Sequence, residues 1–259
     1  MIKFIYALLK GASGMFNFFA NEDSKQDTRY IISGSDYNHI KNVLRMNIGD
    51  TCLISCGGRS DLCRIDGFFD DSVYLEIVEE DYNDTELPVK IYLFQGLPKS
   101  DKMEYIIQKC VELGVYAIAP VRMKRCIVKL DDKKAASKQT RWQSIAESAA
   151  KQSKRNIIPE IMDVCSFGEA LKFAQTLDMV LVPYENKDGM TATVEALSKL
   201  KSVKSVGIFI GPEGGFEDGE IEKAQAAGAT AISLGKRILR TETAATTAVG
   251  MCMLNIEMH

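Results

Sequence analysis

Apolar residues in the first third of the chain occur in short runs that are separated by polar turn residues. The runs have the length of strands, and residues 56–59 (Cys-Gly-Gly-Arg) predict a hairpin turn between two of them. Residues 35–45 carry apolar side chains at helical spacing, with Ser35 or Asp36 as the N-cap. Short strands with one helix favour a small β-barrel over residues 15–82. The expected strands are 16–19, 30–32, 51–55, 62–69 and 73–78.

From Pro88 onward, strand-like apolar runs alternate with helix-like segments. Residues 81–88 are polar and end in proline, so we place a linker and a domain boundary there. The alternation predicts an α/β fold over residues 88–259, with a parallel sheet covered by helices on both faces. Ligands of such sheets bind at the carboxyl ends of the strands. The expected strands are 89–95, 115–121, 179–183, 206–211 and 231–234, and the expected helices are 101–113, 140–153, 167–175, 191–201, 217–227 and 242–257.

The composition is that of an ordinary globular protein, with 259 residues, 46% apolar and 26% charged. No apolar run approaches the roughly 18 residues that a membrane span needs, so we expect no membrane association and a cytoplasmic location. The seven cysteines include no Cys-x-x-Cys pair, and the chain has only two histidines. We therefore expect reduced, mostly buried thiols, a structural role for His39, and no metal site.

Charge is unevenly distributed along the chain. The formal net charge is −3, but residues 1–87 carry −7 and residues 88–259 carry +4. Within the second part, residues 122–155 hold 11 basic and 3 acidic side chains. A local excess of this size is typical of a polyanion-binding surface, although a solvated surface without a partner is the alternative.

Three of the predicted strands run into unusual loops at the expected ligand-binding edge, at residues 181–186, 209–216 and 234–243. The second loop, Phe-Ile-Gly-Pro-Glu-Gly-Gly-Phe, has neither the Gly-x-Gly-x-x-Gly nor the Walker A pattern. The helix after it begins with carboxylates, which would repel a phosphate. Its glycines therefore favour close approach of a neutral or cationic nucleoside, and the alternative is that they only shape a turn. In the third loop, Arg237, Arg240 and Glu242 precede a small, apolar helix, and charged groups beside a buried element usually have a partner or a task.

Taken together, these segments resemble the RsmE family of 16S ribosomal RNA uridine-N3 methyltransferases of the SPOUT superfamily. The resemblance runs from about Met15 to the C-terminus, so residues 1–14 form an N-terminal extension, and Asn17 stands where many members carry Arg. The motifs that carry it are His39 to Arg45 with Gly49-Asp50, Lys99 to Met103, Lys109, Glu112 to Gly114, Glu147 to Gln152, Arg155, Ile210 to Phe216, and Leu234 to Ala244.

The resemblance implies a PUA-like RNA-binding barrel followed by a trefoil-knotted methyltransferase domain, in a homodimer with active sites at its interface. The knot would hold S-adenosyl-L-methionine, and the substrate would be N3 of a decoding-region uridine in 16S rRNA, within an assembled small subunit. The residues expected to bind the cofactor are Leu181, Pro183, Ile210, Gly211, Pro212, Gly214, Gly215, Leu234, Gly235, Ile238, Leu239 and Thr243.

Methyl transfer to uridine N3 requires loss of the N3 proton or stabilisation of the resulting anion. We expect Arg240 to stabilise that anion and Glu242 to orient the base or assist proton loss. Because N3 lies on the Watson–Crick edge, the base must be unpaired or flipped out. The expected phosphate contacts are Arg45, Lys99, Lys102, Arg125 and Arg155.

Three alternatives remain open at the level of sequence. The first is a knotted methyltransferase for another RNA atom, such as a ribose 2′-oxygen or a tRNA guanine, which the identity of the modified nucleoside would distinguish. The second is a non-catalytic RNA-binding or ribosome-assembly factor, which would bind RNA without methyl transfer. The third is a phosphate-cradling nucleotide enzyme, which the acidic helix start and the missing lysine disfavour.

Overall fold

The computed structural model describes residues 15–184 and 190–258, so the predicted extension 1–14 lies outside it, as do Glu185 and Asn186 of the first predicted loop. The chain separates into two compact units, 1–86 with 150–157 and 87–149 with 158–259. The boundary predicted at residues 81–88 places residues 150–157 in the second domain. They group with the first because the backbone carbonyl of Arg155 accepts hydrogen bonds from the side chains of Asn17 (3.0 Å) and Ser55 (3.3 Å).

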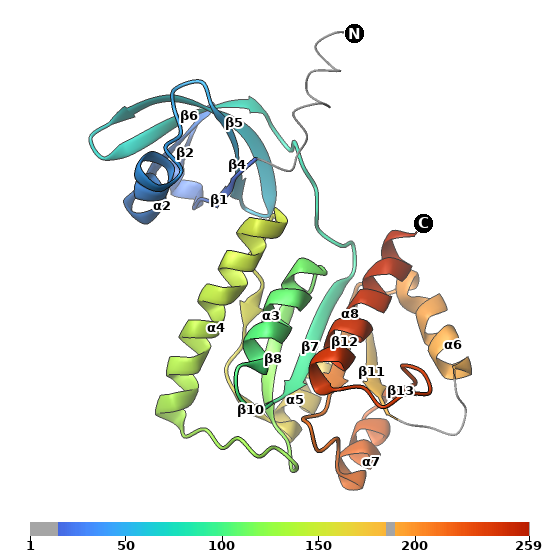
Figure 1. The fold of residues 1–259 in the computed structure, drawn as a ribbon. Coiled ribbons are helices and arrows are strands. Elements are labelled where there is room, and N and C mark those ends of the chain that lie inside the picture. The colour runs from blue at the N-terminus through green and yellow to red at the C-terminus, as the bar shows by residue number, and fades with distance from the viewer. Residues whose placement is uncertain (1–14, 185–189, 259) are drawn as a thin grey trace. The chain divides into compact units, whose positions relative to one another are not determined.

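The first unit is built on a six-stranded sheet of order β1-β4-β5-β6-β3-β2 (Figure 1). β1 pairs with β4 in parallel, and the remaining neighbours are antiparallel. Gly57 and Gly58 have φ angles of 58° and 80° and make the predicted hairpin turn, since such turns need positive φ. The strands are β1 (Asn17–Phe19), β2 (Lys25–Gln26), β3 (Arg29–Ser33), β4 (Thr51–Cys56), β5 (Arg59–Phe69) and β6 (Ser72–Glu79).

The helix predicted at 35–45 is divided into two short pieces. α2 (Gly34–Asn38) begins after Ser33, not at Ser35 or Asp36, and continues as a π-turn, η2 (His39–Val43). A further 3-10 turn, η1 (Glu22–Ser24), precedes β2. His39 is partly buried, and its ring meets Phe18 edge to face, with the ring centroids 6.1 Å apart. The ring therefore packs against the core of this unit.

The core of the first unit lies on one face of its sheet. Phe18, Tyr30, Ile54 and Leu75 are buried there with Cys52, and burial raises the pKa of the Cys52 thiol to about 12. All seven cysteines are free. Among the residues that the structure describes, no three or more His, Cys, Asp or Glu side chains are placed to hold a metal ion.

The second unit contains a parallel sheet of order β10-β8-β7-β12-β11-β13, with β9 beside β8 (Figure 1). The chain runs outward from β7 to β8 and later crosses to β11, so the strand order reverses between β7 and β12. Such a switch point is where open α/β sheets bind ligands, outside the carboxyl ends of the strands. The strands are β7 (Lys90–Gly96), β8 (Ala117–Arg122), β9 (Glu160–Ile161), β10 (Cys165–Ser166), β11 (Met179–Pro183), β12 (Ser205–Ile210) and β13 (Thr230–Ile232).

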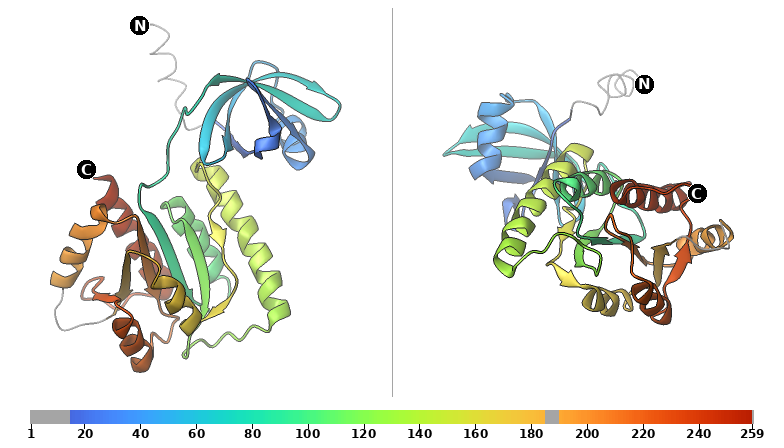
Figure 2. Two further views of the ribbon diagram at one scale, coloured as in Figure 1. Left: turned by 180° about the vertical axis from the view of Figure 1, so that it is seen from behind. Right: turned by 60° about the horizontal axis from the view of Figure 1, so that its bottom comes forward.

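Helices cover both faces of this sheet, as the alternating pattern predicts. α3 and α8 pack together on one face, in front of β7 and β12 in Figure 1. α5, seen from behind in Figure 2, shares an apolar core with α7 on the other face, where Phe94 and Phe209 stack with ring centroids 4.4 Å apart. The helices are α3 (Lys102–Glu112), α4 (Asp132–Ser153), α5 (Phe167–Ala174), α6 (Thr191–Lys199), the 3-10 turn η3 (Leu200–Ser202), α7 (Asp218–Ala226) and α8 (Thr241–Glu257).

Two features of the second unit escaped the sequence prediction. α4 begins at Asp132, eight residues before the predicted start at 140. The prediction missed these residues because only Ala135 is buried in the first turns, so no apolar period appears. β9 and β10 have two residues each and are too short to show a periodic pattern. In the described part of the chain, no helix has the length and apolar character needed to cross a membrane.

Candidate functional site

The carboxyl ends of β11 and β12 and the segment after β13 surround a cavity of about 680 Å³. Pro183 and Tyr184 line it from the end of β11, and the loop after β12 contributes a continuous wall from Ile210 to Phe216. The segment that follows β13 closes it with Ile238, Leu239 and the first residues of α8. A smaller cavity of about 200 Å³ is lined by residues 233–239, and it shares Pro183, Tyr184, Ile238, Leu239 and Ala244 with the large one. The three loops that the sequence singled out therefore surround one site.

Backbone, not long side chains, forms much of the cavity wall at Gly211 and Gly215. A Cβ on Gly211 would lie 3.1 Å from the carbonyl carbon of Gly215 and 3.2 Å from its Cα, and Gly215 has a φ of 69°. The loop is thus folded tightly on itself at the point where a ligand would approach.

The helix after this loop, α7, begins with acidic residues. Glu217 is the N-cap of α7 and forms a capping box with Glu220, whose carboxylate also accepts a hydrogen bond from the backbone N–H of Lys124 at 2.9 Å. These carboxylates place negative charge at the start of α7, which opposes a phosphate there.

Lys102, which we expected to contact RNA phosphate, lies between two carboxylates. Its Nζ is 3.3 Å from Glu213 Oε1 and 3.2 Å from Glu242 Oε2. Glu242 and then Glu213 raise the pKa of Lys102 above its ordinary value, so the ammonium stays charged. Burial alone would raise the pKa of Glu213. The pKa is nevertheless below the usual range, because the carboxylate accepts a hydrogen bond from the backbone N–H of Lys99 at 3.0 Å and lies beside the Lys102 ammonium.

Glu213 lies within the predicted loop 209–216 but is not among the predicted site residues. It lines the large cavity, whereas Glu242 lines an adjoining cavity of about 520 Å³ with Tyr105 and Thr246. Lys102 lines both. Its separation by more than a hundred residues from both glutamates explains why no local pattern could reveal this cluster.

The structure places the residues predicted to bind a cofactor in three groups. Those that line the large cavity are Pro183, Ile210, Gly211, Pro212, Gly214, Gly215, Ile238 and Leu239, and Leu234 and Gly235 line the smaller one. Leu181 is fully buried within β11, and Thr243 lines the adjoining cavity together with Glu242. The side chain of Arg240, at the N-cap of α8, lines the large cavity and has no ion-pair partner among the described residues.

The residues predicted to contact phosphate are divided between the two units. Arg125 lines the large cavity, where its Nη1 donates to the carbonyl of Gly214 at 3.1 Å, and Lys99 is exposed beside Glu213. Arg45 is exposed in the first unit.

Arg155 is 3% exposed and pairs with Glu86 through Nη2 (2.6 Å) and Nε (2.9 Å). A guanidinium so enclosed and neutralised holds residues 150–157 to the first unit and does not present its charge to RNA. We therefore do not retain it as a phosphate contact.

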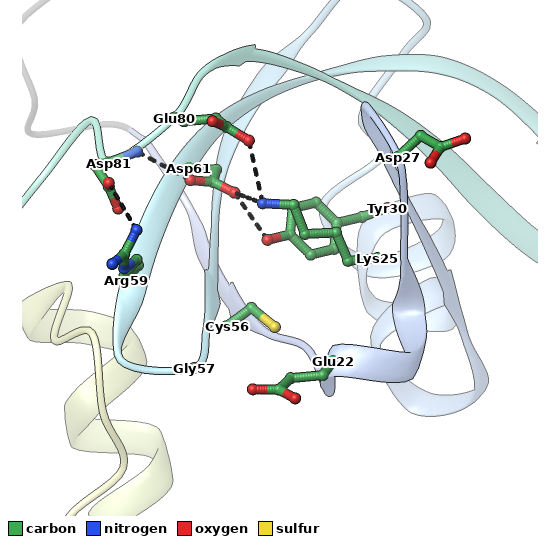
Figure 3. Close-up of a pocket in the computed structure, with 10 residues that line it drawn as sticks. All are labelled: Glu22, Lys25, Asp27, Tyr30, Cys56, Gly57, Arg59, Asp61, Glu80 and Asp81. Atoms are coloured by element: carbon green, nitrogen blue, oxygen red, sulfur yellow. Dashed lines mark hydrogen bonds and ion pairs between the residues drawn. The ribbon is translucent and has the colours of Figure 1, made fainter.

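The first unit has a cavity of its own, of about 520 Å³, and its lining is acidic (Figure 3). Asp61, at its floor, accepts hydrogen bonds from Tyr30 Oη (2.8 Å), Lys25 Nζ (3.1 Å) and the backbone N–H of Asp81 (3.0 Å). Five acidic side chains against two basic ones line the cavity, which disfavours a phosphate ligand here. The residues that line it are Glu22, Lys25, Asp27, Tyr30, Cys56, Gly57, Arg59, Asp61, Glu80 and Asp81.

Replacement of Asp61 by Asn should destabilise the first unit by about 1.5–3 kcal/mol at pH 7, because it removes the charge that three donors satisfy. Burial would raise the pKa of Asp61, but the Asp81 backbone N–H, Tyr30 and Lys25 lower it below its ordinary value. A lowered folded-state pKa means that this contribution is present above the unfolded pKa of about 4 and is lost as the pH falls below it. Urea unfolding at pH 7 and pH 3 measures both effects. An Asn variant as stable as the parent at pH 7 would contradict this account.

Two protein-family models match parts of this chain. A family model described as an RNA methyltransferase domain matches residues 85–253, and one described as an RNA methyltransferase PUA domain matches residues 32–64. The parallel sheet with its loop-lined cavity and the smaller β unit thus define an RNA methyltransferase with a PUA domain.

Relatives define the family more closely. The chain is 43% identical over 220 residues to the ribosomal RNA small subunit methyltransferase E of Bacillus subtilis, covering 83% of this chain and 86% of that protein. The Mesomycoplasma hyopneumoniae protein of the same name is 34% identical, with 92% and 99% covered. A crystal structure of the Neisseria gonorrhoeae enzyme bound to S-adenosyl methionine superimposes with a TM-score of 0.77 at 32% identity, covering 91% of this chain and 95% of that one. The chain belongs to the ribosomal RNA small subunit methyltransferase E family.

Proposed function

We propose that this protein transfers a methyl group from S-adenosyl-L-methionine to N3 of a specific uridine in the 16S rRNA of the small ribosomal subunit. The observation that carries the proposal is the cavity at the carboxyl ends of β11 and β12. Arg240, which has no ion-pair partner among the described residues, lines this cavity, and the Lys102–Glu242 pair lies beside it. The relative from Neisseria gonorrhoeae, which binds S-adenosyl methionine, supports the choice of cofactor.

The residues of the cavity fit this cofactor. Ile210, Phe216 and Leu239 offer apolar contacts to an adenosine, and the glycine loop offers backbone groups at close range. Glu213 and Asp218 place negative charge on the same lining, which suits a cationic sulfonium and opposes a phosphate. When bound, the cofactor supplies an electrophilic methyl group.

The chain's own residues would prepare the uridine. Its N3–H is weakly acidic, and loss of the proton leaves an anion spread over O2, N3 and O4. The guanidinium of Arg240 stabilises this anion, because a fixed cation in a partly enclosed site lowers the cost of developing negative charge. Glu242, held by Lys102 at 3.2 Å, orients the base or accepts its proton.

RNA must present the target base unpaired, since N3 lies on the Watson–Crick edge. Arg125, which lines the cavity, and Lys99, which is exposed beside Glu213, are the contacts proposed for the flanking phosphates. Arg45 is the contact proposed in the first unit. The first unit, which we propose to be a PUA-like barrel, would bind RNA outside the acidic cavity.

The affinity for RNA should fall steeply with salt, and the slope of log K against log salt should become shallower in the double variant Lys99→Ala, Arg125→Ala. Each phosphate contact removed should reduce the slope by about 0.7–0.9. Fluorescence anisotropy with a fragment of 16S rRNA at several KCl concentrations measures this. Lys172→Ala, on α5, is the matched control and should leave the slope unchanged. An unaltered slope in the double variant would leave the basic stretch as plain solvated surface.

Two further elements belong to the proposal. The segment from about Leu181 to the C-terminus would be threaded through a loop as a trefoil knot. Two copies of the chain would form a homodimer with active sites at the interface, for which sedimentation equilibrium is the test.

The decisive experiment maps methylated nucleosides in 16S rRNA from a strain that lacks the protein, before and after the gene is restored. We expect one N3-methyluridine to disappear and return, and purified protein to methylate assembled small subunits in preference to naked rRNA. A different methylated nucleoside would identify another RNA methyltransferase activity. Binding to RNA without transfer of labelled methyl groups would replace the proposal with a non-catalytic assembly factor.

A further inference from the structure

Gln95 is a fully buried polar residue at the carboxyl end of the central strand β7. It pairs in register with Ile210 of β12 on one side and Pro120 of β8 on the other. Its side-chain nitrogen donates to the backbone carbonyl of Gly96 and to the hydroxyl of Thr241, both at 2.9 Å. A buried amide with this placement connects the middle of the sheet to the first residue of α8.

The hydrogen bonds of this group allow only one orientation. A backbone carbonyl can only accept, so the Gln95 nitrogen must face Gly96, and the same nitrogen then donates to Thr241. The single proton of the Thr241 hydroxyl is consequently directed to the carbonyl of Gly211, at 2.7 Å. Gln95 thus determines that Thr241 acts as a donor to the glycine loop.

This relay lies directly behind the proposed site. Thr241 stands between Arg240 and Glu242 and is 5% exposed, and Gly211 belongs to the cavity wall. Gly96 brings the loop close to the strand as well, since a Cβ there would lie 2.7 Å from Pro212. The side-chain oxygen of Gln95 is buried without a hydrogen-bond partner among the described residues. An unpaired buried oxygen costs about 1–3 kcal/mol, which stability alone does not favour.

We infer that Gln95 is a positioning residue for methyl transfer: through Thr241 it fixes the start of α8, and with it Arg240 and Glu242, against the glycine loop that binds the cofactor. The inference rests on the proposed function. It adds that the alignment of the two loops depends on a donor at position 95 and a hydroxyl at position 241.

The test compares Gln95→Met, which keeps the length of the side chain and removes the donor, with Thr241→Val, Thr241→Ser and the double variant Gln95→Met, Thr241→Val. Gln225→Met, exposed on α7, is the control. For each, we would measure the Kd for S-adenosylmethionine by calorimetry, kcat and KM with small subunits, and Tm.

Gln95→Met and Thr241→Val should each lower kcat by about tenfold or more, with KM for the small subunit unchanged, and each should weaken cofactor binding. Thr241→Ser should restore both, and the double variant should be no worse than either single one, because the two residues act through one contact. Full kcat in Gln95→Met, or losses that add in the double variant, would overturn the inference even if a variant is less stable. A parent protein without methyl transfer would instead overturn the proposed function.

Discussion

Arg240→Ala should lower kcat for methyl transfer by about 10²–10³-fold at saturating cofactor and small subunit, because it removes the cation proposed to stabilise the uridine anion. The effect should fall on the chemical step. Arg240 has no ion-pair partner among the described residues, so its loss leaves no carboxylate unpaired there and the fold should be retained. Incorporation of labelled methyl groups into 16S rRNA measures kcat. Calorimetric titration with the cofactor shows whether the variant still folds and binds it.

Two variants sharpen this prediction. Arg240→Lys retains a positive charge but not the planar donors, and its kcat should lie between those of the parent and Arg240→Ala. Arg64→Ala removes an exposed guanidinium that pairs with Glu76 in the first unit, and it should leave kcat unchanged. If Arg240→Ala transfers methyl groups at the parental rate under saturation, the role assigned to Arg240 is wrong.

Gly211→Ala should raise the Kd for S-adenosylmethionine by about tenfold or more. An added carbon in a closely packed site typically costs about 1–3 kcal/mol, and each 1.4 kcal/mol of binding free energy corresponds to about a tenfold change in Kd. The new Cβ would lie 3.1 Å from the backbone of Gly215, so it must displace the loop itself and cannot be relieved by turning a side chain. Isothermal titration of the purified protein with the cofactor gives the Kd directly.

Gly219→Ala is the matched control for this change. Gly219 lies in α7, close along the chain, and a Cβ there would meet nothing within 4 Å. The cofactor Kd should stay at the parental value, while stability should rise by up to about 1 kcal/mol, since alanine favours a helix over glycine. Equal cofactor affinity in Gly211→Ala and the parent would show that the loop does not require a glycine at position 211 for close approach.

The division into strands and helices was predictable where the chain repeats a clear pattern. Residues 90–96 and 205–210 form nearly continuous apolar runs, as expected for strands buried on both faces, and α3 has a well-defined apolar face ending at Gly114. The pattern failed where burial is slight. The start of α4 is polar, and the helix near Tyr37 changes from α to π geometry at His39.

The sequence was sufficient to predict which loops form the candidate site, but not which residues contact one another there. The loops at 211–216 and 234–240 were identifiable because glycine and charged residues follow apolar strands. Their partners were not, since Lys102 meets Glu213 and Glu242 only when α3 packs against α8. Arg155 is the opposite case. Its place in a basic stretch predicts an RNA contact, but the structure buries its side chain and pairs it with Glu86.

The amino-acid sequence by itself determined the alternating α/β pattern, the boundary near residues 81–88, the carboxylate-rich start of α7 and the family resemblance. Each of these depends on residues that are close together along the chain, where spacing and side-chain chemistry suffice. Only the tertiary structure decided that Gln95 reaches Thr241, that Lys102 bridges two glutamates and that residues 150–157 join the first unit. These contacts join positions 69 to 146 residues apart, and packing alone brings them within hydrogen-bonding distance.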